Sequence, residues 1–240
     1  MKHNFGVLSA RKAVAPVLLS LALSIILSSC AVAQVITIEE ATRIAEGGAF
    51  DAESFVETRW PEILSTILNQ SVELPTVLAA IETDSNRQAT KDNLQQVATQ
   101  YGLTTEGQAQ VFMVNGQGSV TAVDTESSRG TIEVALEGYD GPIKVKFLIG
   151  PRLPSDETSV RDAVGFIKFG DFREQTEYGK VARELNQRVI QDVLDGLDRE
   201  NLAGKSVSFY GAFTIRTFNA PSDIDVSEIV VTPVQLEVGG

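Results

Sequence analysis

The sequence predicts an α+β fold, in which a helical N-terminal segment (30–104) precedes a five-stranded, OB-like barrel (105–240) with the element order β-β-β-α-β-β. Three observations support this prediction. Apolar residues recur with helical spacing up to residue 101, and with a period of two from residue 110 onward. One long helical pattern then separates the third strand pattern from the fourth, as in an OB-type barrel. A generic α+β sandwich would explain the same order of elements.

Four helices are expected before the strands. The second begins after Asp51, a residue type that caps helices. Pro61 within it predicts a kink or an early break, because proline lacks an N–H group. Pro75 suits the first turn of the third helix. The fourth is polar and rich in glutamine, so we expect it to lie exposed. The expected ranges are 36–48, 51–68, 75–83 and 86–101.

Five segments show strand patterns, most clearly where Lys144 and Lys146 alternate with apolar neighbours. Pro233 predicts an edge strand or a bulged one, because proline cannot donate to a ladder. Residues 115–118 superficially resemble a phosphate-binding loop. They lack a Lys-Ser/Thr pair and precede a strand pattern, so we expect a kinked strand. The expected strands are 110–123, 130–136, 143–149, 206–218 and 228–238, with a helix over 171–200.

The chain is acidic, with 20 basic and 32 acidic residues and a formal net charge of -12. The first 29 residues contain Lys2, Arg11 and Lys12 and no acidic residue. Without them, 17 basic and 32 acidic residues remain, which gives a charge of about -15. A surface this negative repels phosphate backbones, so nucleic acid is not an expected partner.

Histidine and cysteine are almost absent. The only histidine is His3 and the only cysteine is Cys30, so none remains beyond residue 30. This excludes Ser-His-Asp and Cys-His catalysis, thiol redox chemistry and zinc or copper sites with His or Cys ligands in that part of the chain. We therefore expect no cofactor and no metal.

The first 29 residues have the pattern of a secretory signal peptide: positive charges followed by an uncharged, mostly apolar run over 13–27. The run ends in Leu27-Ser28-Ser29-Cys30, which resembles a bacterial lipobox, so Cys30 is the predicted lipidation site. Cleavage after Ala33 would instead release a soluble product, and an uncleaved anchor is a third alternative. With lipidation, acyl chains attach the protein to the envelope membrane.

Segments throughout residues 55–236 resemble a family of predicted periplasmic lipoproteins, domain of unknown function 2291. The resemblance is most specific between residues 150 and 186, and it departs from the family pattern at 152–158. It implies a lipid-anchored periplasmic protein, often encoded near sugar-uptake ABC transporters, with no established activity. The segments that carry it are Phe55-Val56, Trp60, Leu74-Pro75-Thr76-x-Leu78, Asn115-Gly116-x-Gly118-x-Val120, Gly150-Pro151, Arg161-Asp162-Ala163, Phe166-Ile167-x-Phe169, Asp171-Phe172, Gln175-x-Glu177-Tyr178, Val181-Ala182-x-x-Leu185-Asn186 and Thr232-Pro233-Val234-x-Leu236.

The densest group of polar side chains beside aromatic residues lies between residues 161 and 178. As a binding site for a small polar solute, it would use Arg161 to contact a hydroxyl or carboxylate, and an aromatic ring to stack on a sugar face. The candidate ligand-binding residues are Arg161, Asp162, Asp171, Gln175, Glu177 and Tyr178.

Local structural roles compete with this interpretation. Ser159-x-x-Asp162 and Asp171-x-x-Glu174 are both helix-capping patterns, which short polar side chains favour for local reasons. The phenylalanines nearby would then be core residues. These are Phe166, Phe169 and Phe172.

Three other sites are weaker candidates. Asp162, Asp171 and Glu177 could support glycosidase-type chemistry without histidine, but no spacing marks one pair above another. Asp223 with Asp225 could bind Ca²⁺, although the ligand order of an EF-hand is absent. The loops 124–129 and 219–224 would flank the usual binding face of an OB-like barrel, whereas Trp60, on a helical stripe, is expected in the core.

Two hypotheses of function follow. The first is a non-enzymatic binding or accessory module, tethered to the membrane, that serves a sugar-type uptake system through transporter components or a small polar solute. The second is a carboxylate-dependent hydrolase of envelope glycan. A structural protein that uses its helical N-terminal segment as a docking arm is a third possibility.

Mass spectrometry of the processed protein tests the export prediction. We expect an acylated N-terminal Cys30 and protein in the membrane fraction, because a lipobox cysteine becomes the mature N-terminus. An N-terminal Gln34 would show cleavage after Ala33. An intact, unacylated leader on protein recovered from the cytosol would contradict export.

Overall fold

A computed structural model describes residues 49–218, 220 and 222–239. Phe50–Gly240 forms one compact unit. The predicted signal peptide, Cys30 and the predicted helix 36–48 lie outside the described residues. Within those residues, no helix has the length and hydropathy needed to cross a membrane.

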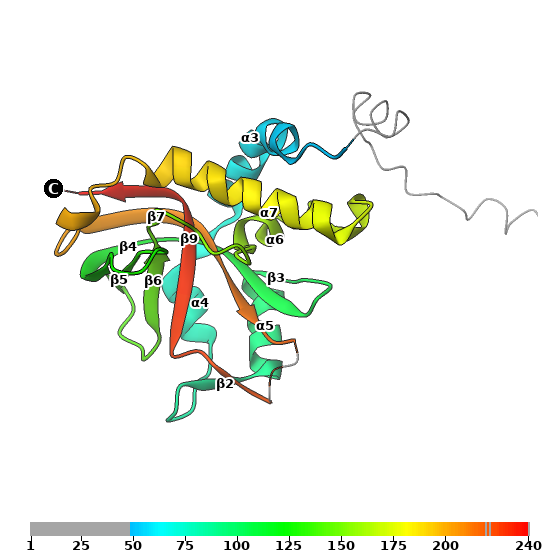
Figure 1. Cartoon of the computed structure of the whole chain (residues 1–240). Helices are drawn as coiled ribbons and strands as arrows, with labels where there is room; N and C mark the ends of the chain where they lie inside the picture. Colours follow the sequence, from blue (N-terminus) through cyan, green and yellow to red (C-terminus); the bar gives the residue numbers. More distant parts are fainter. Residues whose placement is uncertain (1–48, 219, 221, 240) are drawn as a thin grey trace, which may run out of the picture. The chain divides into compact units, whose positions relative to one another are not determined.

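Five long strands form a closed circuit of pairings (Figure 1). β4 pairs with β5, β5 with β6, β6 with β9, β9 with β7, and β7 returns to β4. All pairs are antiparallel except β6–β9. The predicted order, with the long helix between the third and fourth of these strands, is confirmed. Their bounds are β4 Ala109–Asp124, β5 Thr131–Leu136, β6 Lys144–Leu148, β7 Ser206–Arg216 and β9 Glu228–Val238.

The strand count differs from the predicted five. Two short strands, β1 (Val72–Glu73) and β3 (Leu103–Thr104), pair with β4 and make the main sheet seven-stranded. β2 (Gln88–Thr90) and β8 (Asp223–Asp225) form a separate two-stranded sheet. These additional pieces are two or three residues long, too short to show a periodic pattern in the sequence.

Glycine lets neighbouring strands approach β4 closely. A Cβ at Gly116 would lie 3.0 Å from the ring of Phe209, and one at Gly118 would collide with the backbone oxygen of Ala135. Both residues belong to β4. The interpretation of 115–118 as a strand rather than a phosphate loop is therefore confirmed, and these glycines serve packing.

Of the two alternatives predicted for the strand that contains Pro233, an edge strand or a bulged one, the bulged strand is confirmed. β9 pairs with β6 over its first residues and with β7 from Thr232 onward. The β7–β9 register shifts between Tyr210 and Gly211, opposite Gln235 and Pro233. A residue without an N–H group fits here because the ladder is already irregular.

The helices α3 (Ala52–Gln70), α4 (Leu74–Ala80) and α5 (Lys91–Tyr101) precede the long strands. Asp51 caps α3 as predicted, accepting a hydrogen bond from the backbone N–H of Ser54 at 3.1 Å. The early break expected at Pro61 does not occur, because buried residues on both sides of Pro61, such as Trp60 and Ile67, hold the helix against the domain.

The expectation that the polar fourth helix lies exposed is wrong. Leu94, Val97 and Ala98 of α5 are buried, in the same core cluster as Phe112. Three small or medium apolar residues in an otherwise polar helix are enough to attach it to the sheet. This part of the chain thus shares a core with the strands; that 30–104 is separable from 105–240 stays a prediction.

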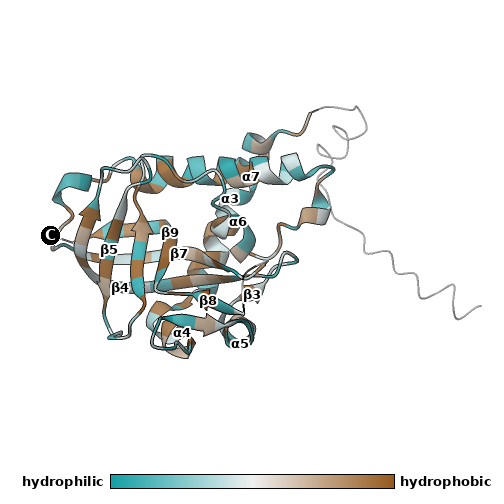
Figure 2. Ribbon diagram, turned by 60° about the horizontal axis from the view of Figure 1, so that its bottom comes forward, coloured by the Kyte–Doolittle hydropathy of each residue, from teal (hydrophilic) through white to brown (hydrophobic). Residues whose placement is uncertain are grey.

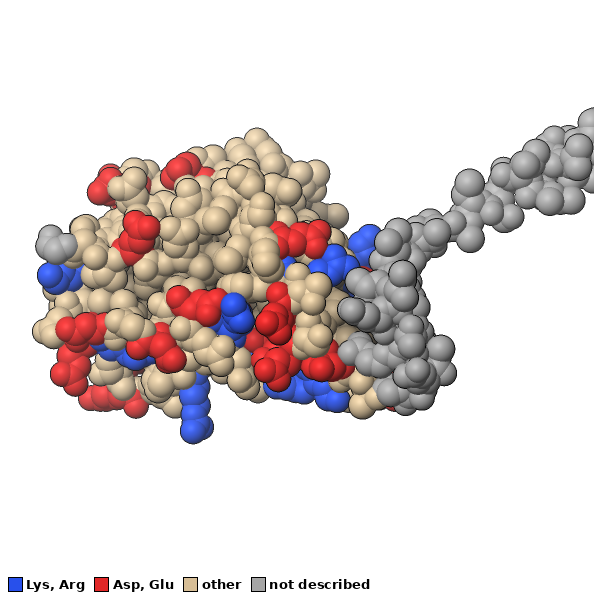
Figure 3. All heavy atoms as spheres, turned by 90° about the horizontal axis from the view of Figure 1, so that it is seen from above, with Lys and Arg blue, Asp and Glu red and all other residues tan. Residues whose placement is uncertain are grey.

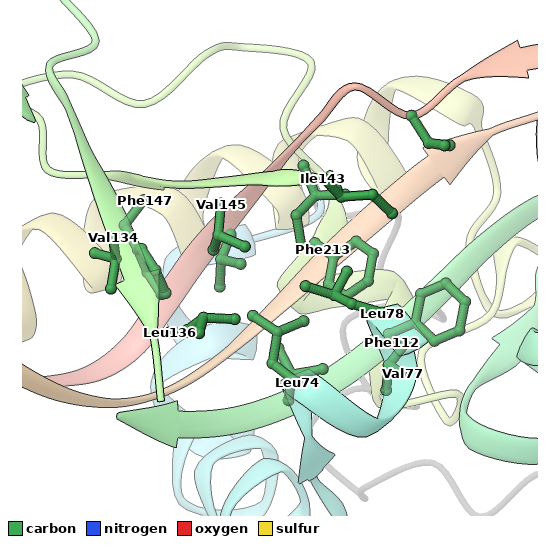
Figure 4. Packing of buried hydrophobic residues seen from close by; sticks show 14 of the residues in the cluster. Leu74, Val77, Leu78, Phe112, Val134, Leu136, Ile143, Val145, Phe147 and Phe213 are labelled. Carbon is green, nitrogen blue, oxygen red and sulfur yellow. The ribbon is translucent and has the colours of Figure 1, made fainter. Parts of the chain in front are cut away.

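The main core lies inside the strand circuit and beneath α4. The rings of Phe112 and Phe213 stack with their centroids 4.8 Å apart. In Figure 4, Leu74 and Leu78 of α4 point toward these strands and their aromatic residues. Figure 2 shows hydrophobic residues alternating with polar ones along the strands, as expected where one face is buried.

A second core packs the remaining helices on the outside of the strands. It joins α3 to α6 (Ser159–Ala163), α7 (Gln175–Val189) and Val234 of β9. Helical structure continues as a π-helix to Leu194 and so ends short of the predicted residue 200. The core role expected of Trp60 is confirmed: it is buried, and its Nε1 donates to Asp192 Oδ2 at 3.0 Å.

Replacing a stacked core ring tests this packing. Phe213→Ala is expected to lower the free energy of unfolding by about 3 to 5 kcal/mol, because it removes buried surface and leaves a cavity. Phe218→Ala is the matched control, since that ring is exposed, and its effect should stay within about 0.5 kcal/mol. Urea denaturation measures both, and equal losses would contradict the assignment of the core.

Candidate functional site

The segment before α6 is anchored to α7 by Asn186. This buried side chain donates from Nδ2 to the backbone oxygens of Glu157, at 3.0 Å, and Pro154, at 3.3 Å. Ser159, at the start of α6, lies with its Oγ 2.9 Å from Thr214 Oγ1 of β7. The short helix α6 is thus fixed between α7 and the sheet, which sets the direction of its polar side chains.

Arg161, Asp162 and Tyr178 form a compact polar cluster between α6 and α7. Arg161 Nε donates to Asp162 Oδ1 at 2.7 Å, and Arg161 Nη2 lies 2.7 Å from the same oxygen as an ion pair. The Tyr178 hydroxyl donates to the same oxygen at 2.9 Å. Arg161 Nη1 donates to the backbone oxygen of Tyr178 at 3.0 Å, and its guanidinium carbon lies 3.5 Å from the centre of the Tyr178 ring. Three residues predicted as a site therefore meet.

The cluster is largely removed from solvent. The side chains of Arg161 and Asp162 are 8% and 10% exposed. Taking an ion pair out of water costs free energy, and these short charge-assisted hydrogen bonds and the cation–π contact offset that cost. Burial, and then the charge of Asp162, raise the pKa of Tyr178, an effect that Arg161 opposes in part. The phenol therefore stays protonated and acts as a hydrogen-bond donor.

All three residues line a cleft of about 660 Å³. This volume is in the range of pockets that bind small molecules. Opposite walls come from the turn that joins β3 to β4 and from the end of β7. The other lining residues are Leu103, Thr104, Thr105, Glu106, Gly107, Ala109, Thr158, Gly165, Ile167, Lys168, Phe169, Thr214, Arg216 and Phe218.

The other three predicted site residues do not line this cleft. Asp171 Oδ2 accepts the backbone N–H of Lys168 at 3.0 Å, and Glu177 Oε2 accepts that of Arg173 at 3.0 Å. Gln175 is exposed at the first position of α7. Asp171 and Glu177 therefore have local structural contacts, which the competing interpretation anticipated in kind.

The two capping patterns are nevertheless wrong in detail. Asp171 closes the 3-10 turn Phe169–Asp171 rather than α7, and Glu174, at the N-cap of α7, makes no side-chain capping bond. Asp162 is engaged by Arg161 and Tyr178. A cap pattern uses local partners, whereas Asp162 bonds a phenol sixteen residues away, which sequence spacing does not reveal.

Sequence reasoning missed the aromatic and cationic rim of the cleft. Phe169, which the competing interpretation placed in the core, is 48% exposed, and Phe218 is 63% exposed. Lys168 and Arg216 also border the cleft. Only the position of Phe218, just beyond an apolar strand and before a polar loop, could have drawn attention to it.

The remaining candidates lie elsewhere. Within the described part of the chain, no group of three His, Cys, Asp or Glu residues could hold a metal ion. Asp223 and Asp225 accept hydrogen bonds from the neighbouring Ser222 and Ser227. The loop 124–129 does not border the cleft, although Phe218 adjoins the other predicted loop, 219–224. The divergent segment 152–158 borders a second, smaller cleft of about 310 Å³.

The surface around the helices is predominantly acidic. On the face seen in Figure 3, which looks down on the side of α3 and α7, acidic side chains are more widespread than basic ones. Burial raises the pKa of Glu184 on α7, and the nearby charges of Glu53 and Asp51 raise it further.

Comparison with a solved structure bears on the fold. The crystal structure of an OB-fold protein from Thermotoga maritima matches 79% of this chain and 99% of its own, with a TM-score of 0.55 and 17% sequence identity. At that identity the likeness shows the fold alone. The molecule is thus a mixed α+β protein similar to an OB-fold protein. Among curated proteins, none matches this sequence.

The profile of the family described as "Predicted periplasmic lipoprotein (DUF2291)" matches residues 20–237, and the chain belongs to that family. The resemblance found in the sequence is confirmed. The protein is accordingly a lipid-anchored protein of the periplasm. The family description assigns no activity.

Removing one hydroxyl tests the cluster. Tyr178→Phe deletes the bond to Asp162 but keeps the ring beneath Arg161, so the free energy of unfolding should fall by about 1.5 to 3 kcal/mol at neutral pH. Tyr101→Phe is the control, because its hydroxyl contacts only exposed Gln100 among the described residues, and its loss should be near zero. Equal effects in urea denaturation would argue against the cluster.

The difference in stability between wild type and Tyr178→Phe is expected to depend on pH. The pKa of Tyr178 lies above the ordinary 10.0 in the folded protein, so just above pH 10 only the unfolded chain loses this proton. Wild type should therefore lose stability relative to Tyr178→Phe as the pH rises through 10, by up to about 1.4 kcal/mol per pH unit. A constant difference between pH 8 and 11 would contradict the shift.

Proposed function

We propose that this protein is a non-enzymatic binding module, in which an OB-like barrel carries a cleft for a small polar solute, tethered to the envelope membrane through Cys30. One observation carries the proposal: the cluster of Arg161, Asp162 and Tyr178, buried on its other sides, borders a cleft of ligand size. Ligand sites typically combine mostly apolar walls with a few fixed polar groups. The wall formed by Leu103, Ile167 and the exposed rings supplies the apolar part.

Binding explains the polar cluster better than catalysis does. A glycosidase needs two carboxylates on either side of the bond it cleaves. Glu106 also lines the cleft, but of the three acids suggested by the sequence only Asp162 does. Its Oδ1 accepts from the guanidinium and from the phenol, so it is positioned as a structural anion. With no histidine or cysteine beyond residue 30, the other common nucleophile and base pairs are missing too.

An accessory role in solute uptake suits this arrangement. A periplasmic tether places the cleft where solutes pass toward transporters in the inner membrane. The family resemblance suggests sugar-uptake systems, and rigid aromatic rings next to polar groups are suited to a sugar, whose hydroxyls bond to polar side chains while its C–H face packs on a ring. The solute and the transporter components are parts of the proposal.

Isothermal titration of the processed protein with hexoses, pentoses and hexuronates tests the binding function. At least one should bind, and Phe169→Ala should weaken it about threefold to tenfold, because an exposed ring in the cleft is lost without disturbing the core. Val238→Ala, an exposed residue outside the cleft, is the matched control.

Chemical crosslinking in intact cells, followed by purification through this protein, tests the partner. A component of a solute transporter should be recovered. If none of the solutes binds and no envelope protein is crosslinked, the proposed function is wrong.

A further inference from the structure

Basic residues outnumber acidic ones in the lining of the cleft, whereas acidic residues outnumber basic ones in the whole chain. Three cations, Arg161, Lys168 and Arg216, and two carboxylates, Glu106 and Asp162, line it. The chain as a whole has 20 basic and 32 acidic residues. Asp162 is paired with Arg161 at 2.7 Å, so the remaining charges that line the cleft are Lys168 and Arg216 against Glu106. A positive cleft in an acidic protein concentrates anions locally.

Two of these cations are available to a ligand. None of the ion pairs between described residues includes Lys168, whose side chain is exposed. Arg216 donates from Nη2 to the backbone oxygen of Asp156 at 2.6 Å, but its Nη1 lies 3.6 Å from the Asp156 carboxylate and its side chain is 59% exposed. An exposed pair of this kind contributes little stability, so a bound carboxylate can compete for the guanidinium.

Arg161 has a different task. Its Nε and Nη2 are committed to Asp162, and its Nη1 to the backbone of Tyr178. It therefore cannot offer the two-pronged face that usually binds a carboxylate. This cluster presents a fixed, nearly neutral polar wall suited to hydroxyls, while the exposed cations Lys168 and Arg216 lie on the rim.

The rim also carries unusual apolar surface. Among the described residues, Phe169 and Phe218 are the most exposed large hydrophobic side chains, at 48% and 63%, and both line this cleft. Exposed aromatic rings that share one concave surface are typical of ligand-binding sites rather than of chance exposure. They favour a ligand with a flat or apolar face.

We infer that the cleft selects a ring compound bearing a carboxylate, whose ring packs on Phe169 and Phe218 and whose charge lies near Lys168 and Arg216. This inference rests on the proposed function, since it names the class of solute that the same cleft binds. Such a carboxylate can be carried by a sugar ring or by an aromatic ring. The two sources share one recognition chemistry and are separated by experiment.

Titration of the processed protein with two matched pairs of probes tests the inference: glucuronate against glucose, and benzoate against benzamide. At least one acid should bind about tenfold more tightly than its neutral partner. Which acid binds identifies the kind of ring. The advantage of the acid should shrink between 20 and 200 mM salt, because exposed charges are screened while stacking is not.

Two variants, one that removes a positive charge and one that removes a negative charge, separate an electrostatic effect on acid binding from structural damage. Lys168→Gln should weaken the bound acid about threefold to fivefold, as expected for one exposed ion pair, and Glu106→Gln should strengthen it. Each variant should change binding of the acid more than binding of the neutral partner, because only the acid carries the charge that they affect. Lys180→Gln, an exposed lysine on α7 away from the cleft, should have no effect.

The outcomes distinguish this inference from the proposed function. Glucose binding as tightly as glucuronate, with benzoate no better than benzamide, would overturn the preference for an acid and leave the binding function standing. Acid binding that neither Lys168→Gln nor Glu106→Gln alters would place the ligand elsewhere and overturn the inference. If none of the four probes binds and the wider solute panel is also negative, both proposals fail.

Discussion

The hydrogen-bonded ion pair between Arg161 and Asp162, clamped onto Tyr178, is the interaction on which the rest of the site depends. It connects α6 to α7, two helices that also share the apolar contacts of the second core. An unpaired charge at this depth would be strongly unfavourable, so each partner requires the other. The pair thus holds one wall of the cleft rigid. Its directional hydrogen bonds, rather than its net stability, define the shape that a ligand meets.

The strand circuit determines where this wall stands. β4 and β7 pair along eleven residues. The start of β4 lies beside the end of β7, and these two strand ends supply Ala109, Thr214 and Arg216 to the cleft. α6 is fixed to β7 through Ser159, and this contact sets the position of the polar cluster relative to the sheet. The exposed rings of Phe169 and Phe218 then come from a turn before α7 and from the end of β7. Residues distant in sequence therefore converge at one edge of a closed sheet.

Much of the fold could be predicted because its signals are local. The alternation around Lys144 and the bulge at Pro233 follow from chemistry within a few residues, and both were confirmed. Half of the predicted site residues line the cleft, namely Arg161, Asp162 and Tyr178. The remainder depends on tertiary packing. Asp171 and Glu177 are acidic residues like Asp162, but their carboxylates contact nearby backbone. Nothing local distinguishes a phenylalanine such as Phe169, at a rim, from one in a core.

The central claim is that Tyr178 and Asp162 act as one unit, and a double-mutant cycle tests it most directly. The free energies of unfolding of wild type, Tyr178→Phe, Asp162→Asn and the double variant would be measured in urea at neutral pH. Both changes disturb the same hydrogen bond, so the account predicts a coupling energy of about 1 kcal/mol or more. Effects that add to within about 0.5 kcal/mol would show that the two side chains are independent and would contradict the account.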